Sequence, residues 1–145
     1  MYLFFKSPVN GYLSVYSIEK DEAFRILPYQ QMSGDNYQYL IVDADREYMF
    51  FKNDQEHSYF ANQAVDYTDE LIMSTDSDEE FLDLYIIFST DKYVKPTLDP
   101  SFTSNTGNYI VPRSLKKSEF ESWLSENRIR NENFVFRKIR LKISK

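Results

Sequence analysis

The clearest pattern in this chain is an alternation of apolar and polar residues near the C-terminus, which predicts a strand. Successive side chains of a strand point to opposite faces, so a repeat of two residues gives one buried and one exposed face. Over 134–143 the apolar positions are Val135, Ile139, Leu141 and Ile143, and the basic ones are Lys138, Arg140 and Lys142. We therefore expect a final strand over 134–143 that is half-buried and has a basic outer face.

Shorter apolar runs predict further strands, which we expect to build one sheet. They are Leu3–Lys6, Tyr12–Ile18, Tyr37–Asp43, Arg46–Lys52 and Phe81–Ser89. The Asn10-Gly11 pair favours the positive φ angles of a reversing turn, so a hairpin of the first two strands is predicted. Residues 43–45 predict a second hairpin, between the next two strands.

Two segments have helical patterns. Ile18–Leu27 has a helical spacing that Pro28 would stop, although a strand fits this segment nearly as well. Ser118 and Glu121 match a capping box, which predicts a helix over 118–127. Its apolar stripe would place Phe120, Trp123 and Leu124 on the sheet and continue to Ile129. Between the last two strands, residues 90–112 predict a long loop with at most a short strand at 109–111.

The composition fits one folded domain over residues 1–145, because 42% of the residues are hydrophobic and 17% are aromatic. The expected fold class is α+β, mainly an antiparallel sheet with one C-terminal helix packed on it. The chain has no cysteine, which excludes disulfides and thiolate sites. Its apolar N-terminal run is too short for a signal peptide, and no window has the roughly 20 apolar residues of a membrane span. We expect a cytoplasmic protein.

The residue sets that carry catalysis, metal binding or cofactor binding are missing from the sequence. The single histidine, His57, is interpreted as a loop residue, although a hydrolase built on it is a rival hypothesis. The acidic run that begins at Asp76 lacks the glycine and the distal glutamate of a calcium loop. No glycine-rich phosphate loop occurs. We therefore expect a binding protein and not an enzyme, with no metal and no cofactor.

Charge is unevenly distributed along the chain, and it suggests where a partner binds. Residues 1–99 hold 19 acidic and 7 basic residues, whereas 100–145 hold 4 and 10. The stretch 66–83 contains eight carboxylates and no lysine or arginine. Acidic residues interleaved with aromatic anchors suit a basic protein surface, although such a run can also serve solubility alone. The candidate partner-binding residues are Asp76, Asp78, Glu79, Glu80 and Asp83, a second acidic group of Asp43, Asp45 and Glu47, and the anchors Tyr67 and Phe81.

The basic last strand raises the alternative of a nucleic-acid-binding module, with Phe134 and Phe136 as exposed stacking platforms. The net charge of −6 works against it, because the overall field would repel phosphates. We expect the cations of this strand to pair with carboxylates on a neighbouring strand. A further alternative is a phosphate-mimicking inhibitor of a DNA-binding enzyme, whose acidic residues would extend along the surface.

The segment Ile110-Val111-Pro112-Arg113-Ser114-Leu115 and the following Glu119-Phe120-Glu121-Ser122-Trp123-Leu124, in a small acidic chain without cysteine, resemble the immunity proteins of bacterial contact-dependent growth inhibition systems. The resemblance covers mainly the last 40 residues. It implies a cytosolic inhibitor that binds a cognate toxin domain, often a basic nuclease, and blocks its active site or substrate surface. The acidic surface expected above suits such a partner.

Overall fold

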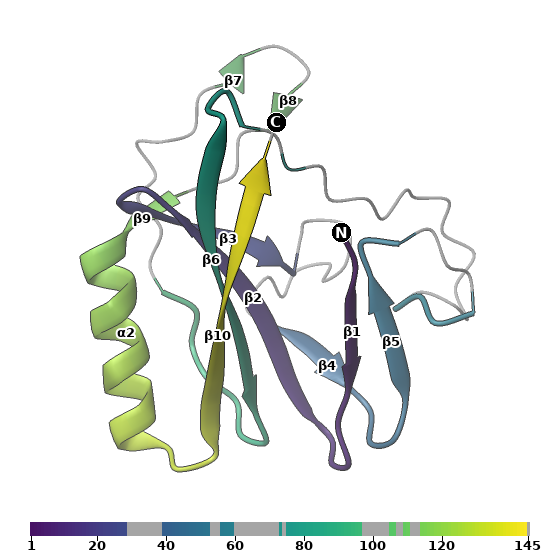
Figure 1. Ribbon diagram of the computed structural model, residues 1–145. Helices are drawn as coiled ribbons and strands as arrows, with labels where there is room; N and C mark the ends of the chain where they lie inside the picture. Colours follow the sequence, from purple (N-terminus) through teal and green to yellow (C-terminus); the bar gives the residue numbers. More distant parts are fainter. Residues whose placement is uncertain are drawn as a thin grey trace.

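The protein has an α+β fold of mostly antiparallel strands, with a helix packed on the main sheet and a strand at the C-terminus, as the sequence predicted. The structure is a computed structural model that describes residues 1–28, 39–52, 56–59, 73, 75–96, 105–106, 109–110 and 114–144. Figure 1 shows the arrangement.

The main sheet has six strands. Five follow the order β10, β6, β2, β3, β9, and the sixth, β4, pairs with residues 11–13 at the start of β2. Their bounds are β2 Gly11–Glu19, β3 Glu22–Leu27, β4 Leu40–Val42, β6 Glu79–Ser89, β9 Ser114–Lys116 and β10 Phe134–Ser144. Two small antiparallel pairs accompany it: β1 (Leu3–Lys6) with β5 (Glu47–Phe50), and β7 (Asn105–Thr106) with β8 (Tyr109–Ile110). The helix α2 spans Lys117–Arg130.

The six-stranded sheet is covered on both faces. The helix α2 lies against one face, and the pair of β1 and β5 lies against the other (Figure 1). The strand β2 is the reason for this arrangement, because almost all its residues, on both faces, are buried. A strand with two apolar faces needs a layer of side chains on each side.

Aromatic rings fill the layer between the sheet and α2. Phe120 of α2 contacts Tyr16 of β2 at 5.0 Å and Tyr85 of β6 at 5.3 Å between ring centroids. Trp123 contacts Phe134 of β10 edge-on at 5.7 Å. Such pairs add about 0.5–1.5 kcal/mol each beyond the apolar area they bury. The helix is therefore held in place by rings from three strands.

The opposite layer is also rich in aromatic residues. Tyr48 and Phe50 of β5 are fully buried against Leu13 and Val15 of β2, and their own rings stack at 6.0 Å. Phe5 of β1 closes the layer, with its ring 5.7 Å from that of Phe88.

Both predicted hairpins and the prediction of a single sheet are wrong. The strand β1 pairs with β5 and not with β2, in a register that joins Leu3 to Phe50. The strand β4 pairs with β2 and not with β5. The predicted turn residues instead connect the loop after β1 with the loop after β4. Asn10 accepts a hydrogen bond from the Ala44 amide, and the Ser7 carbonyl accepts one from the Asp45 amide. The strands pair in this way because the second face of β2 must be covered. The sequences of the turns do not indicate this requirement.

The glycine of the Asn10-Gly11 pair has a role other than a positive φ. A Cβ atom built on Gly11 would overlap the ring of Phe88 and lie 2.7 Å from the Ser89 carbonyl oxygen. Only glycine leaves room for this close approach between β2 and β6.

The helix considered for Ile18–Leu27 is wrong, and the alternative of a strand is partly right: the segment contains the end of β2, a turn and the strand β3. Glu19 pairs with Glu22 across the turn at Lys20 and Asp21, and Lys20 has a φ of 55°. Pairing with β2 buries Ala23 and Leu27. This tertiary pairing outweighs a weak helical spacing.

The helix α2 is longer than predicted and starts without the capping box. It begins at Lys117, and its N-cap Lys116 makes no side-chain capping bond, so Ser118 lies inside the helix. The amide of Lys117 donates instead to the carbonyl of Asp21 in the turn between β2 and β3. The helix continues to Arg130, and Ile129, expected on the buried stripe, is 85% exposed. Of the loop predicted over 90–112, residues 90–96 are described without regular structure, and β8 matches the short strand.

Two buried tyrosines on the helix side of the sheet differ in their hydrogen bonding and provide a test of this packing. Tyr16 is fully buried, and its hydroxyl has no hydrogen-bond partner among the described residues. Burial accordingly raises the pKa of Tyr16 far above its usual value. The hydroxyl of Tyr93 lies 2.8 Å from Ser14 Oγ, also in the interior.

We predict that Tyr16→Phe leaves the free energy of unfolding unchanged or raises it by up to about 1 kcal/mol, because it removes a buried polar atom that has no partner. The matched variant Tyr93→Phe should lower it by about 1 kcal/mol, because Ser14 loses its partner. Urea unfolding at pH 7 measures both. A larger loss for Tyr16→Phe than for Tyr93→Phe would contradict the prediction.

Candidate functional site

The two predicted acidic groups lie at opposite ends of the main sheet. At one end of β6, Glu79 pairs with Ser144, and at the other end Ser89 pairs with Tyr12. The group of Asp43, Asp45 and Glu47 belongs to the second end, where β4 pairs with the start of β2. Eleven strand residues extend roughly 35 Å. The two groups therefore do not form one surface, and each is considered separately.

The first group is an acidic tip that precedes and begins β6; we define it as Asp76, Asp78, Glu79, Glu80 and Phe81. Asp76 and Asp78 are exposed and form no ion pair with any residue in the described part of the chain. Glu79 is exposed but lies next to Lys142 of β10 as an ion pair. Glu80 is partly buried and accepts a hydrogen bond of 2.8 Å from the Thr75 hydroxyl. Phe81, the residue that follows Glu80 in β6, is 58% exposed.

Asp83, the last carboxylate predicted to meet a partner, is instead held inside the fold. Only 8% of the residue is exposed. Its carboxylate accepts hydrogen bonds of 2.7 and 3.1 Å from Arg140 and lies 2.8 Å from Lys138 Nζ. The hydrogen bonds from Arg140 and then Lys138, together with their charges, hold the pKa of Asp83 far below its usual value. The prediction that Asp83 binds a partner is therefore wrong: its carboxylate stabilises the fold.

The basic strand β10 pairs with carboxylates of β6 in the way the sequence suggested. Lys138 and Arg140 share Asp83, and Lys142 pairs with Glu79. The proposed stacking platforms are absent, because Phe134 is 1% exposed and packs against Trp123 and Tyr93, while Phe136 is half-buried under the guanidinium of Arg128. The local pattern of this strand does not show that a helix covers these rings.

The second acidic group forms a loop between β4 and β5, and its side chains are partly engaged. Asp43 lies 3.6 Å from Arg46 and accepts a hydrogen bond from the Tyr48 hydroxyl. Glu47 lies 3.3 Å from Lys6 and 3.8 Å from His57 Nε2. Asp45 is exposed at a turn with a φ of 60°. This group therefore offers a partner less free negative charge than the acidic tip.

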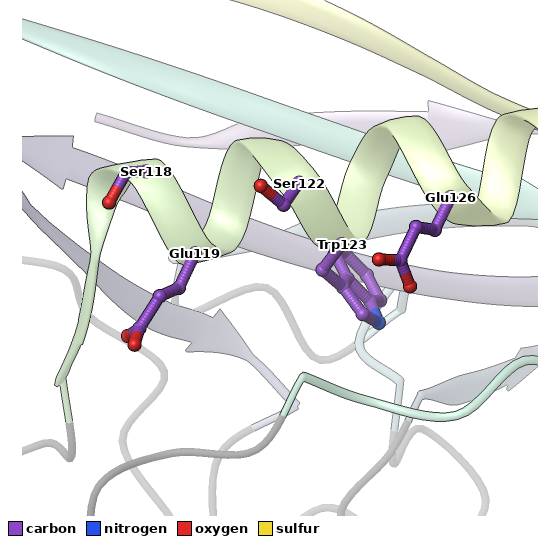
Figure 2. Close-up of a pocket in the computed structure, with 5 residues that line it drawn as sticks. All are labelled: Ser118, Glu119, Ser122, Trp123 and Glu126. Carbon is purple, nitrogen blue, oxygen red and sulfur yellow. The ribbon is translucent and has the colours of Figure 1, made fainter.

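A shallow depression along α2, missed by the sequence interpretation, presents two further carboxylates beside an indole ring (Figure 2). It has a volume of about 340 Å³ and is lined by Ser118, Glu119, Ser122, Trp123 and Glu126. The Trp123 indole nitrogen donates to the Val94 carbonyl at 2.9 Å, which fixes the ring. A spacing of three to four residues in 119–126 places these side chains on one helical face, and that spacing is readable in the sequence.

Some predicted features cannot be placed. The anchor Tyr67 and the carboxylates at 66, 69 and 70 lie outside the described residues. His57 is partly buried, its carbonyl accepts a hydrogen bond from the Met49 amide, and its Nε2 lies 3.8 Å from Glu47. In the part of the chain that the structure describes, no three histidine, cysteine or acidic residues lie close enough together to hold a metal. None of its helices is long and apolar enough to cross a membrane.

Comparison with known proteins gives no match to a family model, to a curated protein or to a solved structure. The function is therefore inferred from the geometry and charges of the described residues.

The buried ion group around Asp83 generates a prediction about pH. Because the folded pKa of Asp83 is lowered, the unfolded chain takes up its proton first as the pH falls below about 4. The stabilisation is complete above that pH and is lost progressively below it. We predict that Asp83→Asn lowers the free energy of unfolding at pH 7 by about 1–3 kcal/mol, the range for hydrogen bonds to charged groups.

Urea unfolding at several pH values measures this effect, with the exposed Asp78→Asn as the matched control. The gap between the wild type and Asp83→Asn should narrow as the pH falls from 5 to 2. A gap that stays constant over this range would show that Asp83 does not stabilise the fold through its charge.

Proposed function

We propose that this protein is a non-catalytic immunity protein that binds a cognate bacterial toxin domain, a basic nuclease, and covers its active site or substrate surface in the cytoplasm. The observation that carries the proposal is the acidic tip, in which the exposed carboxylates of Asp76 and Asp78 form no ion pair with a described residue and precede the exposed Phe81 in the chain by five and three residues. Free carboxylates and an exposed aromatic residue in one segment have the composition of a surface that meets a cationic protein.

The mechanism follows from electrostatics. Long-range attraction between the acidic tip and a basic surface speeds their encounter, and a net charge of −6 adds to this attraction. In the complex, Asp76 and Asp78 would take the positions of substrate phosphates on the toxin. Phe81 would bury its ring and supply apolar area that carboxylates cannot give.

The distribution of the remaining charges supports a protein partner over a nucleic acid. Three cations of β10 face two carboxylates of β6, which offset part of the charge that phosphates would need. The rings of Phe134 and Phe136 are covered by Trp123 and Arg128, so they are not open to bases.

The test uses the reading frame directly upstream of this gene, where an immunity gene would have its toxin. We predict that the C-terminal domain of that product binds this protein tightly and that Asp76→Lys/Asp78→Lys weakens the affinity about 100-fold, because two charge pairs of the interface become repulsive. Calorimetry measures the affinity, and growth of cells that express the toxin domain measures protection.

The control is Glu121→Lys/Glu132→Lys, which changes the net charge equally at two exposed positions away from the acidic tip. It should weaken binding less than 5-fold, the part due to long-range attraction alone. Equal losses in the two variants would reject the acidic tip as the interface. Binding to several DNA-binding enzymes, competed by DNA, would favour the phosphate-mimicking inhibitor instead.

A further inference from the structure

The strand β10 is a long sheet edge. It spans eleven residues, Phe134–Ser144, and pairs with β6 along its whole length without a bulge. It is the terminal strand of the sheet order, and no strand in the described part of the chain pairs with its other side. In Figure 1, β10 (yellow) is drawn in front of β6.

An edge of this kind presents backbone groups that lack partners. In an antiparallel pair, amides and carbonyls alternate between the two sides of the strand, so about half of those in β10 point away from β6. Proteins usually protect such an edge by making it short, bulged, interrupted by proline or charged. The edge of β10 has eleven residues, a continuous register and no proline, so its protection consists of charge, the exposed cations Arg137, Lys138, Arg140 and Lys142. Cations repel a strand of like charge but not a strand that carries carboxylates.

Side chains on the two faces of β10 define what could lie beside it. Lys138, Arg140 and Lys142 follow one another on the face that α2 covers farther along. On the opposite face, Val135 is 53% and Ile139 is 36% exposed. Arg137, also exposed, lies between them on that face. A neighbouring strand would therefore meet cations on one face and, on the other, two apolar side chains with one cation between them.

The charge of β10 decides whether a second copy of this chain or a segment of another protein suits this edge better. If a second copy of this chain paired antiparallel about Ile139, Lys138 of one copy would lie opposite Arg140 of the other, and like charges in that position are destabilising. The segment 128–144 holds six cations and one carboxylate, and only two carboxylates of β6, Asp83 and Glu79, face the basic residues of β10. The remaining positive charge suits a segment that carries carboxylates.

We propose that β10 accepts an extended segment of a partner protein as an additional strand of the sheet, and that this segment alternates acidic and apolar residues. Its backbone completes the hydrogen bonds of the β10 edge. Its carboxylates lie beside Lys138 and Arg140, and its apolar residues lie beside Val135 and Ile139. This surface is separate from the acidic tip and opposite in charge, so the proposal goes beyond the binding of a basic toxin domain and does not depend on it.

The probe is a synthetic nine-residue peptide that alternates glutamate and valine, added to the isotope-labelled full chain. We expect amide hydrogen exchange, followed by NMR, to slow at alternate residues of β10, at least tenfold, because those amides gain acceptors. The intervening amides, which already bond to β6, should not change. A peptide with lysine in place of glutamate should bind at least tenfold more weakly.

Two N-methylated forms of the peptide test the backbone geometry. One carries methyl groups on every glutamate amide and the other on every valine amide, so only one form loses the donors that face β10. That form alone should lose binding at least tenfold. Equal effects of both forms, or exchange changes at α2 or at the acidic tip, would overturn the proposal.

Variants separate the charge contribution from a general effect. Lys138→Gln/Lys142→Gln should weaken binding of the glutamate peptide at least tenfold, while Arg140 still holds Asp83. Lys20→Gln/Lys116→Gln changes two exposed cations, one in the turn between β2 and β3 and one on β9 at the opposite edge of the sheet, and should leave binding within about twofold. If the protein instead forms dimers through β10 in sedimentation experiments, or if a single-stranded oligonucleotide causes the β10 exchange changes and the peptide does not, the acidic-segment proposal is wrong.

Discussion

Burial of β2 on both faces is the constraint from which the rest of this structure follows. Leu13 and Val15 face one layer and Tyr16 and Ile18 face the other, and all four are almost completely buried. A sheet with one solvated face cannot contain such a strand. The helix α2 covers one side, and the pair of β1 and β5 covers the other. The strand β1 therefore lies in the layer that covers β2 and does not form a hairpin with β2.

The same sheet largely cancels the charge separation seen along the chain. The acidic residues of β6 and the basic residues of β10 are more than 50 positions apart in sequence, but the register places Arg140 beside Asp83 and brings Lys142 to Glu79. The charge of a segment in sequence therefore overstates the charge it offers to a partner. Asp76 and Asp78 keep their charge free of ion pairs in the described part because they lie before the strand and so have no cross-strand neighbour.

Patterns that depend on burial predicted this fold better than patterns that depend on local turns and caps. The apolar run of β6 is a direct consequence of packing, and both β6 and β10 occur where expected. The buried face predicted for β10 is wrong, because Val135 is 53% and Ile139 is 36% exposed, whereas Phe134, on the face of the basic residues, is buried under α2. Asn10-Gly11 and Ser118 are local signals, and at both places tertiary contacts decide the outcome: Gly11 makes room for Phe88, and the start of α2 is fixed by the Asp21 carbonyl. For the candidate site, residue types were sufficient to find exposed Asp76 and Asp78, but not to separate them from Asp83. That distinction requires knowing which cations lie across the strand.

The two surfaces with unused binding capacity meet at one end of the sheet, and this limits how both can act. Glu79 and Glu80 of the acidic tip pair with Ser144 and Ile143, the last residues of β10. A carboxylate-bearing strand that extended this far would meet the acidic tip, and like charges at neighbouring strand positions repel each other. An added acidic segment is therefore best accommodated between Val135 and Arg140, where Lys138 and Arg140 outnumber Asp83. In that register the acidic tip stays open, so a basic surface and an acidic strand can be bound at the same time.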